Sequence, residues 1–158
     1  MPRTSAGIAL YRRAGDGIEL FLAHPGGPFW KNKDDGAWTF PKGEYTADED
    51  PLVAARREFR EEIGLDLDGE FIDLGAVKQS GGKIVRVFAA EGDCDPAAIR
   101  SNTFKQVWPP KSGRYVEFPE VDRAGWFAPA DARRKLLSAQ AEFVDRLCDR
   151  LRIDTNTQ

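Results

Sequence analysis

The chain has 158 residues and a mass of 17.6 kDa, which is the size of one ordinary domain and enough to bury a core unaided. Hydrophobic residues make up 41% and charged residues 31% of the sequence, as in water-soluble globular proteins, and the formal net charge is −3. That charge excludes a general attraction to nucleic-acid backbones or anionic membranes, so we expect neither as a partner.

Two cysteines, Cys94 and Cys148, and a single histidine, His24, are too few for a zinc site of cysteine and histidine ligands. We expect both cysteines to be unpaired, and buried or inert. The apolar run at residues 6–10 is too short for a secretory signal, and no stretch is long enough to span a bilayer. We therefore expect a cytoplasmic protein with a single domain over residues 1–152 and a flexible tail at residues 153–158.

The first predicted elements are β-strands at residues 6–11 and 19–23, joined as a hairpin by a turn that contains two glycines and an aspartate. A loop dense in glycine, proline and charge follows from His24 to Gly36. Loops of this length in a compact domain are often functional, so we predict that it forms one wall of a binding pocket. In the alternative interpretation, His24 is structural and the lysines of the loop are merely solvated.

Residues 38–42 predict a short strand that ends at Pro41, and residues 51–63 predict a helix. Pro51 is tolerated where a helix begins, and Gly64 suits the left-handed turn that closes one. At about 100° per residue, the apolar side chains of this helix fall on one stripe and its glutamates on another. We expect the apolar stripe to pack and the acidic stripe to face outward.

Glu58, Glu61 and Glu62 are spaced i, i+3 and i+4, so their carboxylates can converge on one point. Their mutual repulsion favours a cation between them, and a hard divalent ion, Mg²⁺ or Mn²⁺, is the natural partner. The alternative is a solvated charged helix with ion pairs along its surface.

The helix and the loop before it together resemble the Nudix box, G-x5-E-x7-R-E-U-x-E-E-x-G-U, where U is a bulky apolar residue. Every specified position is filled, by Gly43, Glu49, Arg57, Glu58, Phe59, Glu61, Glu62, Gly64 and Leu65. The resemblance implies the Nudix α/β fold, an α/β/α sandwich around a mixed β-sheet. It also implies hydrolysis of a nucleoside diphosphate linked to another group, with water attacking a phosphorus of the pyrophosphate bridge.

The resemblance assigns roles within the box. It implies metal binding by Glu58, Glu61 and Glu62 and a loop at Gly43 whose backbone can approach metal and phosphates. One of the glutamates can also serve as the base, while Arg57 supports and orients them, as does Glu49.

Downstream, residues 71–78 and 84–90 predict a second hairpin, residues 101–107 a further strand, and residues 108–114 a loop rich in proline. Helices are predicted at residues 129–137 and 138–152. Many Nudix enzymes take a further glutamate, as ligand or base, from near such an aromatic strand as the one ending at Phe127. Glu120 is the first candidate and Glu117 the second.

For the substrate, we expect an aromatic side chain against a base and basic side chains near the phosphates. The candidates are Trp30, Lys31, Lys33, Lys42, Arg114 and Tyr115. Pro41 and Lys42 resemble the diadenosine polyphosphate hydrolase and related polyphosphate branches, so dinucleoside polyphosphates or nucleoside triphosphates are the favoured substrates. A nucleotide sugar is one alternative, and a nucleotide-sensing module without turnover is another, against which the intact acidic set argues.

Overall fold

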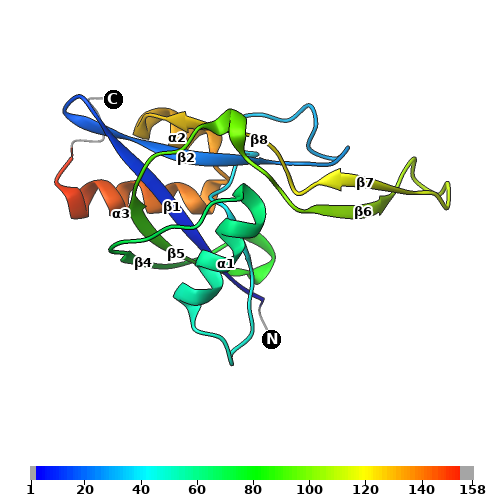
Figure 1. Ribbon diagram of the computed structural model, residues 1–158, viewed down its shortest axis with the longest axis horizontal. Coiled ribbons are helices and arrows are strands. Elements are labelled where there is room, and N and C mark those ends of the chain that lie inside the picture. Colours follow the sequence, from blue (N-terminus) through cyan, green and yellow to red (C-terminus); the bar gives the residue numbers. More distant parts are fainter. Residues whose placement is uncertain (1–2, 154–158) are drawn as a thin grey trace.

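A central sheet lies between two layers of helices in the computed structural model, which describes residues 3–153 (Figure 1). The strands are β1 (Thr4–Ala14), β2 (Gly17–Pro25), β3 (Lys42–Glu44), β4 (Ile72–Lys78), β5 (Ile84–Glu91), β6 (Thr103–Val107), β7 (Tyr115–Pro119) and β8 (Val121–Phe127). The helices are α1 (Pro51–Ile63), α2 (Pro129–Lys135) and α3 (Ala141–Leu151), with short 3₁₀ turns at Ser80–Gly82, Pro96–Ala98 and Ser138–Gln140.

The main sheet has the order β4-β5-β1-β2-β8, and β3 is added on β1. β1 runs parallel to β5 and antiparallel to β2 and β3, so the sheet is mixed. β3 pairs with Ser5–Gly7 of β1, whereas β2 pairs with Tyr11–Ala14 farther along the same strand. This pairing places the loop between β3 and α1 beside the first residues of β1.

Alternate residues of β1 serve two separate cores, as the period of two in a strand requires. Ile8 and Leu10 face the core beneath α1, which also contains the fully buried Phe59. Ala9 and Tyr11 face the other core, which is covered by α2 and α3. The predicted α/β/α sandwich around a mixed sheet is therefore confirmed.

The first two predicted hairpins are confirmed as β1–β2 and β4–β5. The strand predicted at residues 38–42 is wrong, because Trp38 and Thr39 form only isolated bridges and the strand is β3, at Lys42–Glu44. The predicted helix at residues 138–152 is a 3₁₀ turn followed by α3.

A second, two-stranded sheet is formed by β6 and β7, and in Figure 1 this ribbon extends away from the main sheet. Its base contacts the segment after β2: a Cβ on Gly26 would lie 1.9 Å from the carbonyl oxygen of Pro119, and one on Gly27 would lie 2.9 Å from the ring of Phe104. Glycine at both positions lets the segment and the ribbon approach this closely.

No helix within residues 3–153 is both long and apolar enough to cross a membrane. At the end of the described chain, the Ile153 backbone N–H donates to the Cys148 carbonyl oxygen at 2.8 Å. The rest of the predicted tail, residues 154–158, lies outside the described residues. Both cysteines are free, as predicted, and Cys148 is buried.

Candidate active site

Helix α1 is fixed at both ends by its sequence. The Asp50 side chain accepts a hydrogen bond from the Val53 N–H, and Gly64 closes the helix at φ 88° with its N–H donated to the Arg60 carbonyl. Phe59 is fully buried, and burial of such a side chain stabilises the packed helix by about 1.5–3 kcal/mol. The rotation of α1 about its axis, and hence the direction of its glutamates, follows from this packing.

Glu62 does not face outward as the acidic stripe was predicted to do, because only 8% of it is exposed. Its Oε2 atom is buried without a hydrogen-bond partner. Burial raises the pKa of this carboxyl well above its ordinary value, and the charges of Glu58 and Glu120 add to the effect. The charge of Lys42 and a hydrogen bond with the Lys42 backbone oppose this shift without reversing it.

The carboxyl group of Glu58 lies directly against the backbone of Gly43. A Cβ atom at this position would lie 2.0 Å from the Glu58 carboxyl carbon, a distance that real Cβ contacts do not reach. The Glu58 side chain is only 15% exposed. Glycine is thus required here by close approach rather than by turn geometry.

Arg57 connects the other acidic side chains of the Nudix box. Its guanidinium donates to Glu49, and it lies 3.1 Å from the nearer oxygen of Glu58 and 3.9 Å from that of Glu61. A guanidinium offers five donors in a fixed plane, so one arginine can orient several carboxylates at once. Arg57 thus lies within reach of three carboxylates of the Nudix box.

A cavity of about 440 Å³ opens beside these residues; we call it the acidic cavity. It is lined by Ser5, Lys42, Gly43, Glu44, Glu58, Lys83 and Glu120. Burial, followed by the charges of Glu58 and Glu61, raises the pKa of the Glu120 carboxyl. Burial also lowers the pKa of the Lys42 ammonium, although the nearby carboxylates oppose this shift. Two lysines and several carboxylates therefore face one space.

Lys83 was not among the residues selected from the sequence. It lies in the turn between β4 and β5, about 40 residues after Lys42, and the two come together because β3 and β5 both pair with the first residues of β1. A lysine in a glycine-rich turn has no local feature that marks it as a binding residue. Only the tertiary structure shows that Lys83 lines the cavity.

A second and larger cavity, of about 630 Å³, lies on the other side of the segment Pro119–Glu120; we call it the aromatic cavity. Its lining residues are Gly27, Pro28, Lys31, Asn32, Trp108, Phe118, Pro119 and Asp122. Pro119 lines this cavity and the next residue, Glu120, lines the acidic cavity, so the two cavities are neighbours. Lys31 is the one residue of the predicted substrate set that lines the aromatic cavity.

Several other predicted residues lie elsewhere. Trp30 is partly buried against the core under α2 and α3, and the Lys33 ammonium lies 5.2 Å from its ring centroid. Tyr115 is 72% exposed on the ribbon, and Arg114 is exposed in the loop before it. Glu117 accepts a hydrogen bond from the Thr103 hydroxyl across the ribbon. In the described part of the chain, none of these five lines either cavity.

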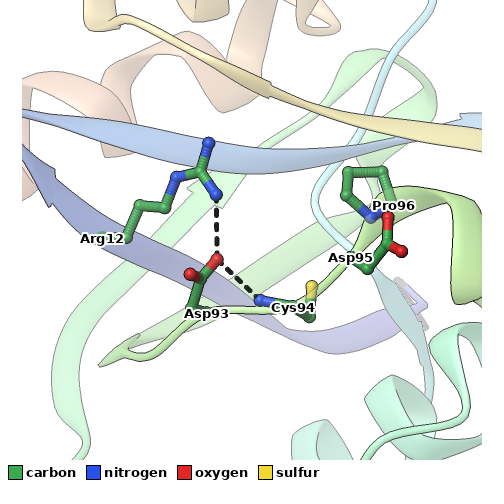
Figure 2. A pocket seen from close by; sticks show the side chains of 5 residues that line it. All are labelled: Arg12, Asp93, Cys94, Asp95 and Pro96. Carbon is green, nitrogen blue, oxygen red and sulfur yellow. Dashed lines mark hydrogen bonds and ion pairs between the residues drawn. The ribbon is translucent and has the colours of Figure 1, made fainter.

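Another cavity of about 440 Å³ lies near the end of β5 and is shown in Figure 2. Arg12 already donates there to Asp93 at 2.9 Å and to Glu19 at 2.8 Å, and its guanidinium lies 4.2 Å from the centroid of Trp126. Burial raises the pKa of the adjacent Cys94 thiol to about 11, which leaves little thiolate at neutral pH. The charged groups of Arg12, Asp93 and Glu19 therefore already have partners within the protein.

The acidic residues fit a divalent cation by their chemistry. Within residues 3–153, no three side chains of histidine, cysteine, aspartate or glutamate are close enough to form a ready-made metal site. The buried, unbonded Oε2 of Glu62 and the Glu58 carboxyl against Gly43 are nevertheless hard oxygen donors, and a cation would supply the missing counter-charge. Glu58 and Glu62 are therefore the residues best suited to hold it.

The model of the NUDIX domain family matches residues 1–147. The fold and this match define a hydrolase that acts on phosphorus-containing acid anhydrides. The chain belongs to the Nudix family. Enzymes of this family generally need divalent metal ions.

Solved structures of related fold include an Ap4A hydrolase of C. elegans in a binary complex. It is 20% identical with a TM-score of 0.68, and the match covers 94% of this chain and 98% of that one. A putative Nudix hydrolase of Listeria monocytogenes is 16% identical with a TM-score of 0.66, over 94% of both chains. The NUDIX domain of Shewanella oneidensis NrtR, complexed with ADP ribose, is 15% identical with a TM-score of 0.64, over 96% of this chain and 89% of that one. A comparison with curated protein sequences finds no match.

Proposed function

We propose that this protein is a pyrophosphohydrolase that uses Mg²⁺ or Mn²⁺ to cleave a pyrophosphate linkage in a nucleotide. The observation that carries the proposal is the acidic cavity, where Glu58 and Glu120 face the same space as Lys42 and Lys83. Carboxylates alone repel phosphates, and lysines alone do not activate water. Both are needed at a site that hydrolyses a phosphoanhydride.

Each side chain has a distinct task in this proposal. Glu58 and Glu62 hold the cation, which, when bound, neutralises phosphate oxygens and lowers the pKa of water. Lys42 and Lys83 bind the phosphate oxygens that face the cavity. Glu120 accepts the proton of the attacking water, since its carboxyl lines the cavity and its raised pKa lies closer to neutrality, as a general base requires.

Arg57 acts through the glutamates and does not touch the substrate. Its contacts with Glu49, Glu58 and Glu61 hold the carboxylates in place when no cation is bound. Loss of Arg57 should therefore give a milder defect than loss of a metal ligand.

The aromatic cavity supports a nucleotide substrate, because it lies beside the acidic cavity and contains Trp108 and Phe118. A planar base can stack on such rings. Among possible nucleotides, we favour dinucleoside polyphosphates or nucleoside triphosphates. The C. elegans neighbour is an Ap4A hydrolase and the Shewanella neighbour was crystallised with ADP ribose, so ligands of this chemical type occur within the fold.

The test is a panel of dinucleoside polyphosphates, nucleoside triphosphates, ADP-ribose and nucleotide sugars, incubated with Mg²⁺ or Mn²⁺ and resolved by chromatography. We expect two phosphorylated products from at least one substrate. Glu62→Gln should abolish this hydrolysis, while Glu142→Gln on the exposed face of α3 should not. Tight binding of a nucleotide with no turnover under any of these conditions would instead indicate a sensing module.

A further inference from the structure

His24, the single histidine of the chain, is completely buried near the end of β2. Its Nε2 atom lies 2.7 Å from the carbonyl oxygen of Lys33, and its Nδ1 atom lies 2.8 Å from Oδ1 of Asp122. The ring also packs edge-on against Trp38, with centroids 5.2 Å apart. A buried histidine with both nitrogens bonded is held in one orientation.

The partners determine which atoms donate. A carbonyl oxygen can only accept, so Nε2 carries a proton and donates to Lys33. Oδ1 of Asp122 also lies 3.9 Å from the Arg123 guanidinium. The contact between Nδ1 and Oδ1 of Asp122 is the second hydrogen bond of the ring.

The other charged groups around this ring belong to neighbouring elements. Asp34 accepts a hydrogen bond from the indole of Trp38 and pairs with Lys135 of α2 at 2.7 Å. Arg123 of β8 lies 5.3 Å from the Trp38 ring centroid. Lys135 is thus paired with Asp34, and Arg123 lies near Asp122.

One partner of His24, Asp122, lines the aromatic cavity, and the other, Lys33, belongs to a segment whose neighbouring residues line it. Lys33 lies in the segment from Gly26 to Gly36, which contributes Gly27, Pro28, Lys31 and Asn32 to the lining, and Asp122 lines the cavity from β8. His24 therefore joins the two sides of the cavity through its own ring. Only Oδ1 of Asp122 takes part in the hydrogen bond to His24, so the second carboxylate oxygen remains available as an acceptor.

We propose that His24 is a positioning residue that fastens the Gly26–Gly36 segment to β8 and orients Asp122, whose free carboxylate oxygen accepts a hydrogen bond from an amino group of the substrate base. The inference rests on the proposed function for the presence of a nucleotide, and it adds a specificity determinant. Asp122 favours bases that present an N–H donor on the edge that faces it.

The experiment measures binding of nucleoside monophosphates, which have no pyrophosphate linkage, by calorimetry. AMP is compared with purine riboside monophosphate and GMP with inosine monophosphate, because each pair differs only by one amino group. We expect the amino-bearing member of at least one pair to bind about tenfold more tightly, the effect of one hydrogen bond to a charged group. Asp122→Asn and His24→Phe should reduce the ratio to within about twofold.

Val144→Ala is the matched control, since it removes buried volume from α3, which lines neither the aromatic nor the acidic cavity, and should lower the melting temperature without altering the ratio. Should His24→Phe not fold, His24→Asn takes its place. NMR of the parent should show a proton on Nε2 of His24, the atom that faces the Lys33 carbonyl oxygen.

Equal binding within both pairs by the parent overturns the proposal, as does binding of none of the four nucleotides. An unchanged ratio in either Asp122→Asn or the folded His24 variant overturns it too. Absence of hydrolysis on the full substrate panel would refute the proposed function alone, because a preserved difference in monophosphate binding would still support the roles of His24 and Asp122.

Discussion

Glu62 combines a buried carboxyl group with an unbonded oxygen, so its charged form is unfavourable until a cation is present. In metal-free protein, the unfolded chain ionises this residue at a lower pH than the folded chain does. Folding above that pH therefore carries a free-energy cost, which disappears when the pH falls below the ordinary glutamate value of about 4.3.

The first prediction follows for Glu62→Gln. Metal-free protein with this substitution should melt at a higher temperature than the parent at neutral pH, and the difference should vanish near pH 4. Hydrolysis should fall by roughly 10²–10⁴-fold or more, because a metal ligand is lost. Thermal melting across pH beside steady-state kinetics checks both; a variant that melts lower at neutral pH and keeps parental rates would reject the role given to Glu62.

The second prediction concerns Gly43→Ala. The added Cβ would occupy the position of the Glu58 carboxyl group, so the side chain must rotate away and the site must lose one oxygen donor. We expect at least a tenfold loss of kcat/KM with a folded protein. Gly36→Ala, in a loop where a Cβ meets nothing within 4 Å but φ is +77°, controls for the loss of a glycine as such. Parental kcat/KM in Gly43→Ala would contradict the contact.

At the scale of the elements, the ribbon of β6 and β7 offers two aromatic side chains that differ in position. Trp108 lines the aromatic cavity, whereas Tyr115 is exposed and does not line it. The third prediction is that Trp108→Ala raises KM by about five- to fifty-fold at similar kcat, as loss of one stacked base does, and that Tyr115→Ala leaves both constants within twofold. Initial-rate kinetics of the two variants test this prediction. A larger rise in KM for Tyr115→Ala than for Trp108→Ala would contradict it and indicate that the base binds at Tyr115.

The elements also show what local sequence can and cannot specify. The ends of α1 follow from Asp50, Pro51 and Gly64, and its register follows from apolar spacing, so the helix was predicted with its observed bounds. β3 was misplaced because three residues contain no periodicity, and their pairing with β1 is decided by the distant Ser5–Gly7. Bulky alternation at residues 38–40 instead reflects burial of Trp38 and Phe40 in the core.

The candidate site divides in the same way. The spacing of the glutamates along α1 predicts their directions about the helix axis. It does not predict which other part of the chain packs over Glu62, so the burial of Glu62 could not be predicted from the sequence. Trp30 and Trp108 have similar surroundings in the sequence, and only the packing of the Gly26–Gly36 segment against the ribbon sends one toward the core and the other toward a cavity. Lys83 enters through sheet pairing alone.

For the whole molecule, the fourth prediction is that a divalent cation couples activity to stability. A chelator should abolish hydrolysis reversibly, and added Mg²⁺ or Mn²⁺ should raise the melting temperature, with a gain near 2.7 kcal/mol at about 100 times Kd. Glu62→Gln should lose most of that gain, whereas Glu142→Gln should keep it. Full turnover with negligible measured metal, or equal stabilisation of both variants, would count against the site.

The ribbon of β6 and β7 has consequences for how this protein can change over evolution. It forms its own small sheet and is joined to the sandwich mainly at its base, around Gly26, Gly27 and Pro119. Its length and tip, residues 108–114, can therefore be exchanged while the strands that carry α1 stay the same. A variant in which the tip is shortened to a two-residue turn, or replaced with the tip of a relative, should have a different ligand preference and an unaltered hydrolytic site. Ligand selectivity and hydrolytic chemistry could then evolve independently of each other.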